Sequence, residues 1–399
     1  MTEAANPAAP AEHPAPTPAG GAVSIAASWA AGRIVDCRLT SRRPDAARLL
    51  VGKTPPEVLL LVPRLFSLCG QAQRAVAAAA LDAAGGRSTP EPAGLAATLR
   101  REAIGEHLWR LMIDWPAALA RGAAVDAAGG ALAPLPHGDP RPSPQRESRR
   151  PSHGGSFQLS HRDSLQSQKK QRDAAFAAWY RRLRSPEPDA ELAAALGAGV
   201  PRSLLATLLD AVPDWERPLT QTPTYLPDFD QTLADELLRR PAPSFAAAPT
   251  WRGGAAEVGA LARFAAAPEV LALQAAGQSL AARLTARWLA LQDDIAGLGG
   301  AAGADPAVAA VAAGDGLGYA WTATARGPLC HRVVLAGNRV ADYAVIAPTE
   351  WNFHPASAWA AALIGVRAES REMAENLVRL WALALDPCVP VQLHLSEEN

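Results

Sequence analysis

The sequence contains few cysteines and carries almost no net charge. Four cysteines in 399 residues cannot form the dense disulfide framework that stabilises a small secreted domain. The net charge of −1 creates no overall field that would attract nucleic acid or anionic lipid. We therefore expect neither a nucleic-acid partner nor a membrane partner for the chain as a whole.

Signals for secretion and membrane insertion are also lacking. The N-terminal segment lacks the basic start and apolar centre of a signal peptide, since it reads MTEAANPAAPAEHPAPTPAGG. No run of about 18 or more apolar residues is present, which excludes an obvious membrane-spanning helix. The expected location is the cytoplasm, where thiols stay reduced.

Alanine is abundant, and it contributes to a hydrophobic fraction of 49% against 19% charged residues. Because alanine favours helices but buries little surface, the composition predicts closely packed helices. Hydrophobic periodicity predicts helices over residues 48–61, 67–84, 94–114, 173–183, 191–196, 203–211, 231–240, 257–291 and 370–385. We predict one strand over 34–39 and a C-terminal hairpin that turns at 336–338. The expected fold class is mainly α with a small β element.

Two segments lack the bulky residues that a packed core requires. Residues 1–22 are rich in alanine and proline and are predicted to be a disordered tail. Residues 134–172 are rich in proline, serine and basic residues, and we interpret them as a flexible basic loop. Nucleic-acid binding is the alternative for this loop, although 141–150 lack interleaved aromatic residues. The loop divides the remaining chain into 23–133 and 173–394, with a short tail at 395–399.

Two cysteines lie in distinctive segments near opposite ends of the chain. Cys69 lies within RLFSLCGQAQ, and Cys388 lies within DPCVPVQLH. A lone buried cysteine is usually a packing residue. We interpret Cys37 and Cys330, which lie outside such segments, in that way.

These segments resemble motifs of nickel–iron hydrogenase large subunits. The segment LLVGKTPPEVLLLVPRLFSLCGQAQ is similar to the family's Gly-Arg-x-Pro and Arg-x-Cys-Gly-x-Cys-x-x-x-His motifs. The segments ATARGPLCHRVVLAGNRVADYAVIAPTEWN and LDPCVPVQLH are similar to its Ala-Pro-Arg-Gly hairpin and its terminal Asp-Pro-Cys-x-x-Cys-x-x-His. The resemblance covers 45–115 and 317–394, and it implies a large-subunit-like helical body.

The chain departs from these motifs at metal-ligand positions. In the family, four thiolates hold nickel, and two of them bridge to an iron that carries cyanide and carbon monoxide. Phe66 and Val391 replace two of the four cysteines here, and Gln73 replaces a histidine. Because phenylalanine and valine donate no lone pair, the resemblance implies that nickel is not bound.

Other parts of the family's pocket are retained. Arg326 matches the arginine over the diatomic ligands, and Pro348 and Thr349 match the proline–hydroxyl pair that supports a cyanide. Such donors suit a buried, charged acceptor. For Arg326 the alternative is a surface ion pair. Cys69 and Cys388 are the expected ligands, and Arg64 and His394 are motif residues expected to support the site.

This combination resembles the HupK-type accessory proteins of hydrogenase expression and formation. The resemblance implies a non-catalytic scaffold that transiently holds iron with cyanide and carbonyl ligands, without nickel. Its partners would be hydrogenase maturation chaperones and the apo large subunit. The alternative is a metal-free paralogue that binds maturation proteins through a large-subunit-like surface. A working hydrogenase is disfavoured, because GRIVDCRL lacks the family's Arg-x-Glu-Gly-His segment.

Several remaining residues have structural interpretations. We expect His331 and His354 to be hydrogen-bonded structural residues, and His137, His153 and His161 to be solvated loop residues. Trp351 and Asn352 are expected to support the hairpin turn. Glu106–His107 lacks the second histidine of a zinc-protease motif. The tail 395–399 is polar and acidic, and we expect that no protease removes it.

Overall fold

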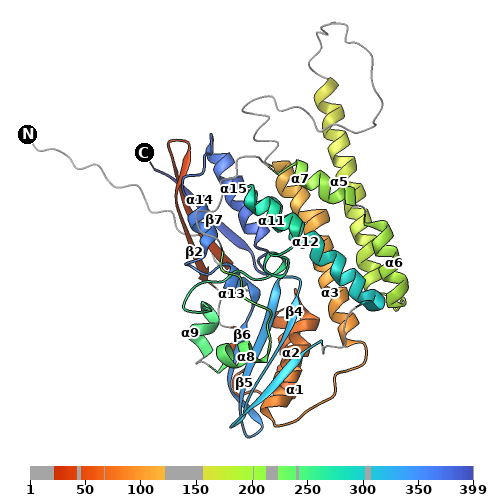
Figure 1. Ribbon diagram of the computed structural model, residues 1–399, viewed down its shortest axis with the longest axis vertical. Coiled ribbons are helices and arrows are strands. Elements are labelled where there is room, and N and C mark those ends of the chain that lie inside the picture. Colours follow the sequence, from red (N-terminus) through yellow and green to blue (C-terminus); the bar gives the residue numbers. More distant parts are fainter. Residues whose placement is uncertain are drawn as a thin grey trace, which may run out of the picture.

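Figure 1 shows the computed structural model, which describes residues 22–42, 46–66, 68–121, 156–200, 202–212, 223–239, 242–301 and 307–398. Within these residues the helical elements are η1 (Ala46–Leu50), α1 (Pro55–Leu65), α2 (Gly70–Ala84), α3 (Leu95–Trp109), η2 (Arg110–Asp114), α5 (Ser156–Leu183), α6 (Asp189–Gly199), α7 (Arg202–Asp210), α8 (Gln231–Leu238), α9 (Ala242–Ala247), α10 (Ala260–Arg263), α11 (Pro268–Ala275), α12 (Ser279–Ala296), η3 (Gly297–Ala301), α13 (Pro348–Asn352), α14 (Ala358–Leu363) and α15 (Arg371–Ala384).

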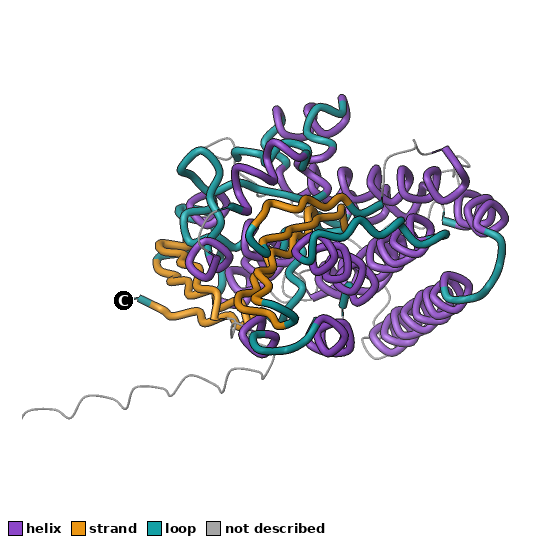
Figure 2. Tube along the Cα trace, turned by 90° about the horizontal axis from the view of Figure 1, so that it is seen from below, coloured by secondary structure: helices purple, strands orange, loops and turns teal. Residues whose placement is uncertain are grey.

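Two β-sheets lie within the described part of the chain, and Figure 2 shows them as separate groups of strands. The first has the order β2-β1-β7, in which β1 and β2 form a hairpin and β7 pairs parallel to β1. The second is an antiparallel meander in the order β3-β4-β5-β6. The strands are β1 (Ala22–Ala30), β2 (Arg33–Arg42), β3 (Ala309–Gly314), β4 (Leu317–Thr324), β5 (Gly327–Ala336), β6 (Arg339–Ile346) and β7 (Val391–Glu397).

The β content therefore exceeds the small β element that the sequence predicted. Strands β5 and β6 pair on either side of Gly337 and Asn338, but they belong to a four-stranded sheet. Strands β1 and β3 read AVSIAASWA and AAVAAG. Alanine and serine signal strands weakly, and here pairing with neighbouring strands outweighs local propensity.

Several predicted helix boundaries were wrong, in one case because the backbone breaks and in another because the helix continues. The helix predicted over 257–291 divides into α10, α11 and α12, with Pro268 at the start of α11 and Gly277 in a left-handed conformation before α12. The helix predicted to end at residue 114 continues past Pro116 to Arg121. The π-turn η2 lies just before Pro116 and changes the hydrogen-bond register of this helix.

The predicted basic loop over 134–172 was wrong for its second half. Residues 156–172 are helical and belong to α5, where Lys169 and Asp173 form an ion pair one turn apart. Glutamine, lysine and arginine favour helices even without an apolar face, which explains the difference. Residues 134–155 lie outside the described residues. The predicted disordered tail does so too, except Ala22, which begins β1.

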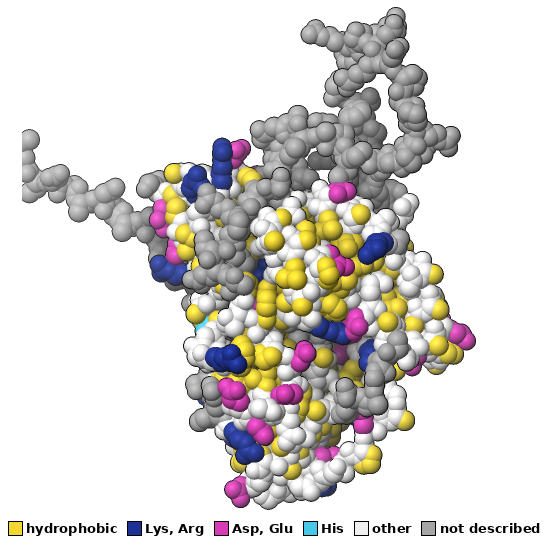
Figure 3. All heavy atoms as spheres, in the orientation of Figure 1, with side chains coloured by type: hydrophobic (Ala, Val, Ile, Leu, Met, Phe, Trp, Pro, Cys, Tyr) yellow, Lys and Arg dark blue, Asp and Glu magenta, His cyan; other side chains and the backbone are white. Residues whose placement is uncertain are grey.

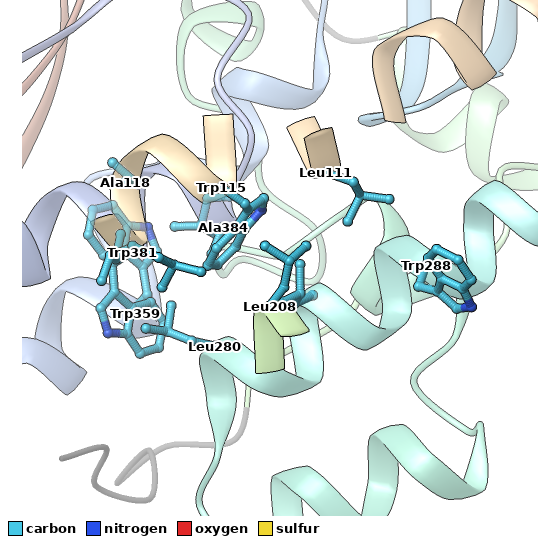
Figure 4. Packing of buried hydrophobic residues seen from close by; sticks show 14 of the residues in the cluster. Leu111, Trp115, Ala118, Leu208, Leu280, Trp288, Trp359, Trp381 and Ala384 are labelled. Atoms are coloured by element: carbon cyan, nitrogen blue, oxygen red, sulfur yellow. The ribbon is translucent and has the colours of Figure 1, made fainter. Parts of the chain in front are cut away.

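The main hydrophobic core joins the three-stranded sheet to α3, α5, α6, α7, α12, α14 and α15. Figure 4 shows its aromatic centre, where Trp359 and Trp381 stack with their ring centroids 6.4 Å apart and Trp115 lies nearby. A second core packs α1 and α2 against the four-stranded sheet. The close approach of α2 requires Gly318 on β4, since a Cβ there would lie 2.2 Å from the Ala84 nitrogen.

No single helix in the described residues is long and apolar enough to span a membrane; only the pair α6 and α7, bent by 44°, passes that test together. Both helices contribute leucines to the main core. On the face that Figure 3 shows, charged side chains of both signs are scattered among hydrophobic ones.

Candidate cysteine site

Cys69 lies at the N-terminus of α2, directly after the turn that follows α1. The N-cap side chain usually accepts hydrogen bonds from the first backbone N–H groups of a helix. Here Glu102 of α3 takes that role, because its carboxylate accepts the N–H groups of Gln71 and Ala72 at 2.9 and 3.0 Å. The Cys69 sulfur is therefore not used for capping and is available for other contacts.

Cys388 lies in the loop between α15 and β7, where the Thr349 hydroxyl makes two hydrogen bonds to it. The Thr349 hydroxyl lies 3.1 Å from the Cys388 sulfur, to which it donates, and it accepts the backbone N–H of Cys388 at 3.1 Å. Thr349 is buried in the first turn of α13, where Pro348 fixes the start of the helix. Pro348 and Thr349 therefore position the cysteine loop.

The two thiols and Arg326 lie within electrostatic reach of one another. The pKa of the Cys69 thiol is raised to about 12, chiefly by burial and secondly by the charge of Cys388, whereas Arg326 opposes this rise. Although burial alone would lower the pKa of Arg326, the surrounding acids and both cysteines raise it. The fold thus brings Cys69, Cys388 and Arg326, which are distant in sequence, into one neighbourhood.

Arg326 lies on the two-residue turn between β4 and β5 and is only 4% exposed. Its Nη2 donates to Glu106 Oε2 at 2.6 Å, and its Nε lies 3.4 Å from Asp386 Oδ1 without making a hydrogen bond. Gly259 lets this turn pack closely, since a Cβ there would lie 2.6 Å from the Arg326 carbonyl oxygen. Arg326 is therefore a buried cation with a free donor, and the surface ion-pair alternative was wrong.

Asp386 is the centre of a buried cluster of three arginines, an arrangement that no motif in the sequence predicted. Its carboxylate lies 2.5 Å from Arg110 Nε and 2.9 Å from Arg287 Nη2, in addition to Arg326. Burial would raise the pKa of Asp386, but Arg287, Arg326 and Arg110 outweigh it and lower the pKa. Since Asp386 precedes Cys388 by two residues, the cluster fixes the cysteine loop to η2, α12 and the β4–β5 turn.

Gln73 connects Cys69 to the four-stranded sheet. Its Nε2 donates to the Cys69 sulfur at 3.6 Å, and its Oε1 lies 2.8 Å from His331 Nε2. In the motif, Gln73 stands only where the family has a histidine. Its position four residues after Cys69 was the available signal, because residues i and i+4 share a helix face.

Two predicted site residues have exposed side chains. Arg64 is exposed in the last turn of α1. His394 is exposed on β7, opposite Ala26 of β1. Because α1 and β7 direct these positions toward solvent, the expectation that they support the site stays a prediction.

The remaining cysteines and histidines whose side chains are described, and Asn352, pack in hydrophobic cores or make hydrogen bonds that support the fold. Cys37 and Cys330 are buried in separate hydrophobic cores. His354 accepts a backbone N–H from Ala356. Asn352 bonds Val258 and the Leu385 carbonyl, so it supports the segment before Asp386 rather than the predicted hairpin turn. His137 and His153 lie outside the described residues, as does the side chain of His161.

The chemistry of this site is that of two thiols with nearby donors. Among the described residues, no group of three or more His, Cys, Asp or Glu side chains could hold a metal ion. A metal bound here would need further ligands of its own. Arg326 and Thr349 supply hydrogen-bond donors beside the two sulfurs, which suits ligands that are acceptors.

Comparison with curated proteins finds relatives along almost the whole chain. The hydrogenase expression/formation protein HoxV of Cupriavidus necator is 30% identical over 397 residues, covering 90% of this chain and 93% of the relative. The hydrogenase expression/formation protein HupK of Azotobacter vinelandii is 32% identical over 380 residues, covering 91% and 94%. No family model matches the chain.

Solved structures with a similar fold include nickel–iron–selenium hydrogenases. The enzyme from Desulfovibrio vulgaris Hildenborough gives a TM-score of 0.52 at 18% identity, covering 90% of this chain and 95% of that chain. The enzyme from Desulfomicrobium baculatum gives 0.51 at 15% identity, covering 90% and 94%. These similarities establish the large-subunit-like fold predicted from the motifs.

Proposed function

The chain belongs to the HupK/HoxV family of hydrogenase expression/formation proteins, and from this premise we propose that it is a non-catalytic scaffold in hydrogenase maturation. In this proposal Cys69 and Cys388 hold iron with its cyanide and carbonyl ligands, and the chain passes this cargo to the apo large subunit. Its other partners are the chaperones that supply the cargo.

The observation that carries the proposal is the arrangement of two thiols beside a buried, charged donor. Thr349 donates to the Cys388 sulfur, and Arg326 lies within electrostatic reach of both sulfurs with its Nε free of hydrogen bonds. A cyanide on iron is a charged acceptor, whose burial is costly without donors. Three diatomic ligands and two thiolates leave the iron with little need for further protein ligands.

This chain's residues have defined tasks in holding the cargo. Each thiol must lose its proton to become a ligand, and the positive charge of Arg326 favours the thiolate of Cys69. As thiolates, the two sulfurs would coordinate the iron. Phe66 and Val391 stand at two positions where the catalytic family has nickel ligands, so nickel would find only two sulfurs.

The second candidate is a metal-free paralogue that binds maturation proteins. Two observations favour it. The pKa of the Cys69 thiol is raised to about 12, which disfavours the thiolate that a metal needs as its ligand. In addition, the described residues lack a group of three or more His, Cys, Asp or Glu side chains that could hold a metal ion. Production of the protein with and without the hydrogenase maturation proteins separates the candidates. The scaffold purifies with equimolar iron only in their presence, whereas the metal-free paralogue contains no iron in either case.

We predict that the chain is not cut after His394. Leu395, Ser396 and Glu397 pair with β1, and Leu395 is only 9% exposed. The predicted start of the tail, directly after residue 394, therefore falls inside β7. A strand paired within a sheet is a poor protease substrate. Intact-mass measurement on protein from cells that mature hydrogenase should show a chain that continues past His394; a species ending at His394 would refute the prediction.

A further inference from the structure

We propose that Tyr343 and His331 hold the Gln73 amide in one orientation, with its NH2 group toward Cys69, so that the sulfur is supported as a hydrogen-bond acceptor. This makes Gln73, His331 and Tyr343 positioning residues for the cysteine site. The inference deepens the proposed function, because it concerns a sulfur that would hold the cargo. Its test uses metal-free protein, so it can fail or succeed independently of cargo binding.

The three side chains form a continuous buried chain of hydrogen bonds, which we call the relay. The distances are 3.6 Å from Gln73 Nε2 to the Cys69 sulfur, 2.8 Å from Gln73 Oε1 to His331 Nε2, and 2.8 Å from His331 Nδ1 to the Tyr343 hydroxyl. None of the three is more than 4% exposed. They come from α2, β5 and β6, so the relay links Cys69 to the sheet.

Hydrogen-bond chemistry allows one consistent proton arrangement for this geometry. The amide oxygen of Gln73 can only accept, so His331 must carry its proton on Nε2. Nδ1 of a neutral imidazole then accepts, and the Tyr343 hydroxyl donates to it. Burial lowers the pKa of His331 to about 3, which keeps the ring neutral.

The orientation matters because a thiol and a thiolate need different partners. An amide NH2 group can only donate, and a deprotonated or metal-bound sulfur accepts. Reversal of the amide would require His331 to carry its proton on Nδ1, so that Nε2 could accept the NH2 group. The Tyr343 hydroxyl, whose hydrogen-bond partner among the described residues is His331 Nδ1, would then lose its acceptor and become a buried donor without a partner. The relay therefore keeps a hydrogen-bond donor directed at the Cys69 sulfur.

The test measures the rate at which iodoacetamide alkylates Cys69 in metal-free protein, with Cys388 of the same sample as the internal reference. We expect His331→Leu to slow alkylation of Cys69 about tenfold, because the released amide no longer holds a donor at the reacting sulfur. Tyr343→Phe removes only the hydroxyl that bonds His331 Nδ1 and leaves the bond between His331 and Gln73. It should therefore slow alkylation of Cys69 less, about threefold. His331→Gln can again present a donor to the Gln73 oxygen and should restore most of the rate.

Tyr319→Phe is the matched control, since it removes a buried tyrosine hydroxyl from the same sheet outside the relay, where Tyr319 bonds Asp235. It should leave the Cys69 rate unchanged. The inference is overturned if Tyr343→Phe has no effect on Cys69, or if Tyr319→Phe slows it equally. If His331→Leu does not fold, the ¹⁵N spectrum of histidine-labelled wild-type protein decides: a proton on Nε2 of His331 supports the relay, and a proton on Nδ1 contradicts it.

Discussion

Replacing Cys69 or Cys388 with serine should abolish iron loading while leaving the protein folded. A serine hydroxyl is a far weaker ligand for iron than a thiolate, and with only two protein ligands the loss of either removes half of the attachment. Neither change should disturb the fold. Serine is a preferred N-cap residue at position 69, and at position 388 it can still bond Thr349. The measurement is iron content after co-production with the maturation proteins, beside a circular dichroism spectrum.

Cys37→Ser is the control for this pair of variants. Cys37 is buried in β2 within the main core, and burial raises the pKa of its thiol to about 12. Its replacement should cost about 1 kcal/mol of stability, since serine adds a buried hydroxyl, but iron loading should stay at the wild-type level. Equal loss of iron in all three variants would show that the cysteines act through stability, contrary to the proposed site.

Asp386→Asn should destabilise the protein by about 3 kcal/mol or more, the cost of removing one partner from a buried ion pair. The change leaves Arg110, Arg287 and Arg326 buried around a neutral group. Backbone strain is not the cause, because asparagine tolerates the left-handed conformation of Asp386 at φ 55°. Guanidinium denaturation followed by tryptophan fluorescence measures the loss.

The matched control is Glu375→Gln, which removes the charge of a partly exposed carboxylate one helical turn from Arg379. It should cost less than about 0.5 kcal/mol. The pH dependence gives a second check. Because the pKa of Asp386 is lowered in the folded protein, its contribution is fully present above its unfolded value of about 4 and is lost as pH falls below that value. In Asp386→Asn the free energy of unfolding should fall less steeply below about pH 4 than in the wild type. The same pH dependence in both proteins would contradict the role of the cluster.

The sequence was sufficient for the fold where motifs or strong periodicity existed. The motifs around Cys69, Arg326 and Cys388 indicated a large-subunit-like fold, which the hydrogenase structures support. The helix predicted over 370–385 corresponds to α15, which has a serine N-cap and a clear apolar face. Strands β1, β3 and β7 were not predicted. Each is stabilised by pairing with another segment, and a local hydrophobic pattern does not show which segments will pair. In particular, β7 pairs with β1 from the other end of the chain.

For the site, residue types could be predicted but not their buried partners. Arg326 was a candidate from its motif, yet the arginines that share Asp386 with it come from η2 and α12, which show no common pattern in sequence. His331 was expected to be structural, and the link from it through Gln73 to Cys69 depends on α2 packing against the four-stranded sheet. Arg64 and His394 also match motif positions, but unlike Arg326 their side chains are exposed to solvent.

The central claim is that this chain carries iron with cyanide and carbonyl ligands, and infrared spectroscopy tests it most directly. The sample is wild-type protein produced together with the hydrogenase maturation proteins, and Cys388→Ser is prepared in parallel. The account predicts cyanide and carbonyl stretching bands with equimolar iron and no nickel in the wild type, and none of these bands in the variant. Wild-type protein that is free of iron and of these bands, although co-produced with active maturation proteins, would contradict the account and favour the metal-free paralogue.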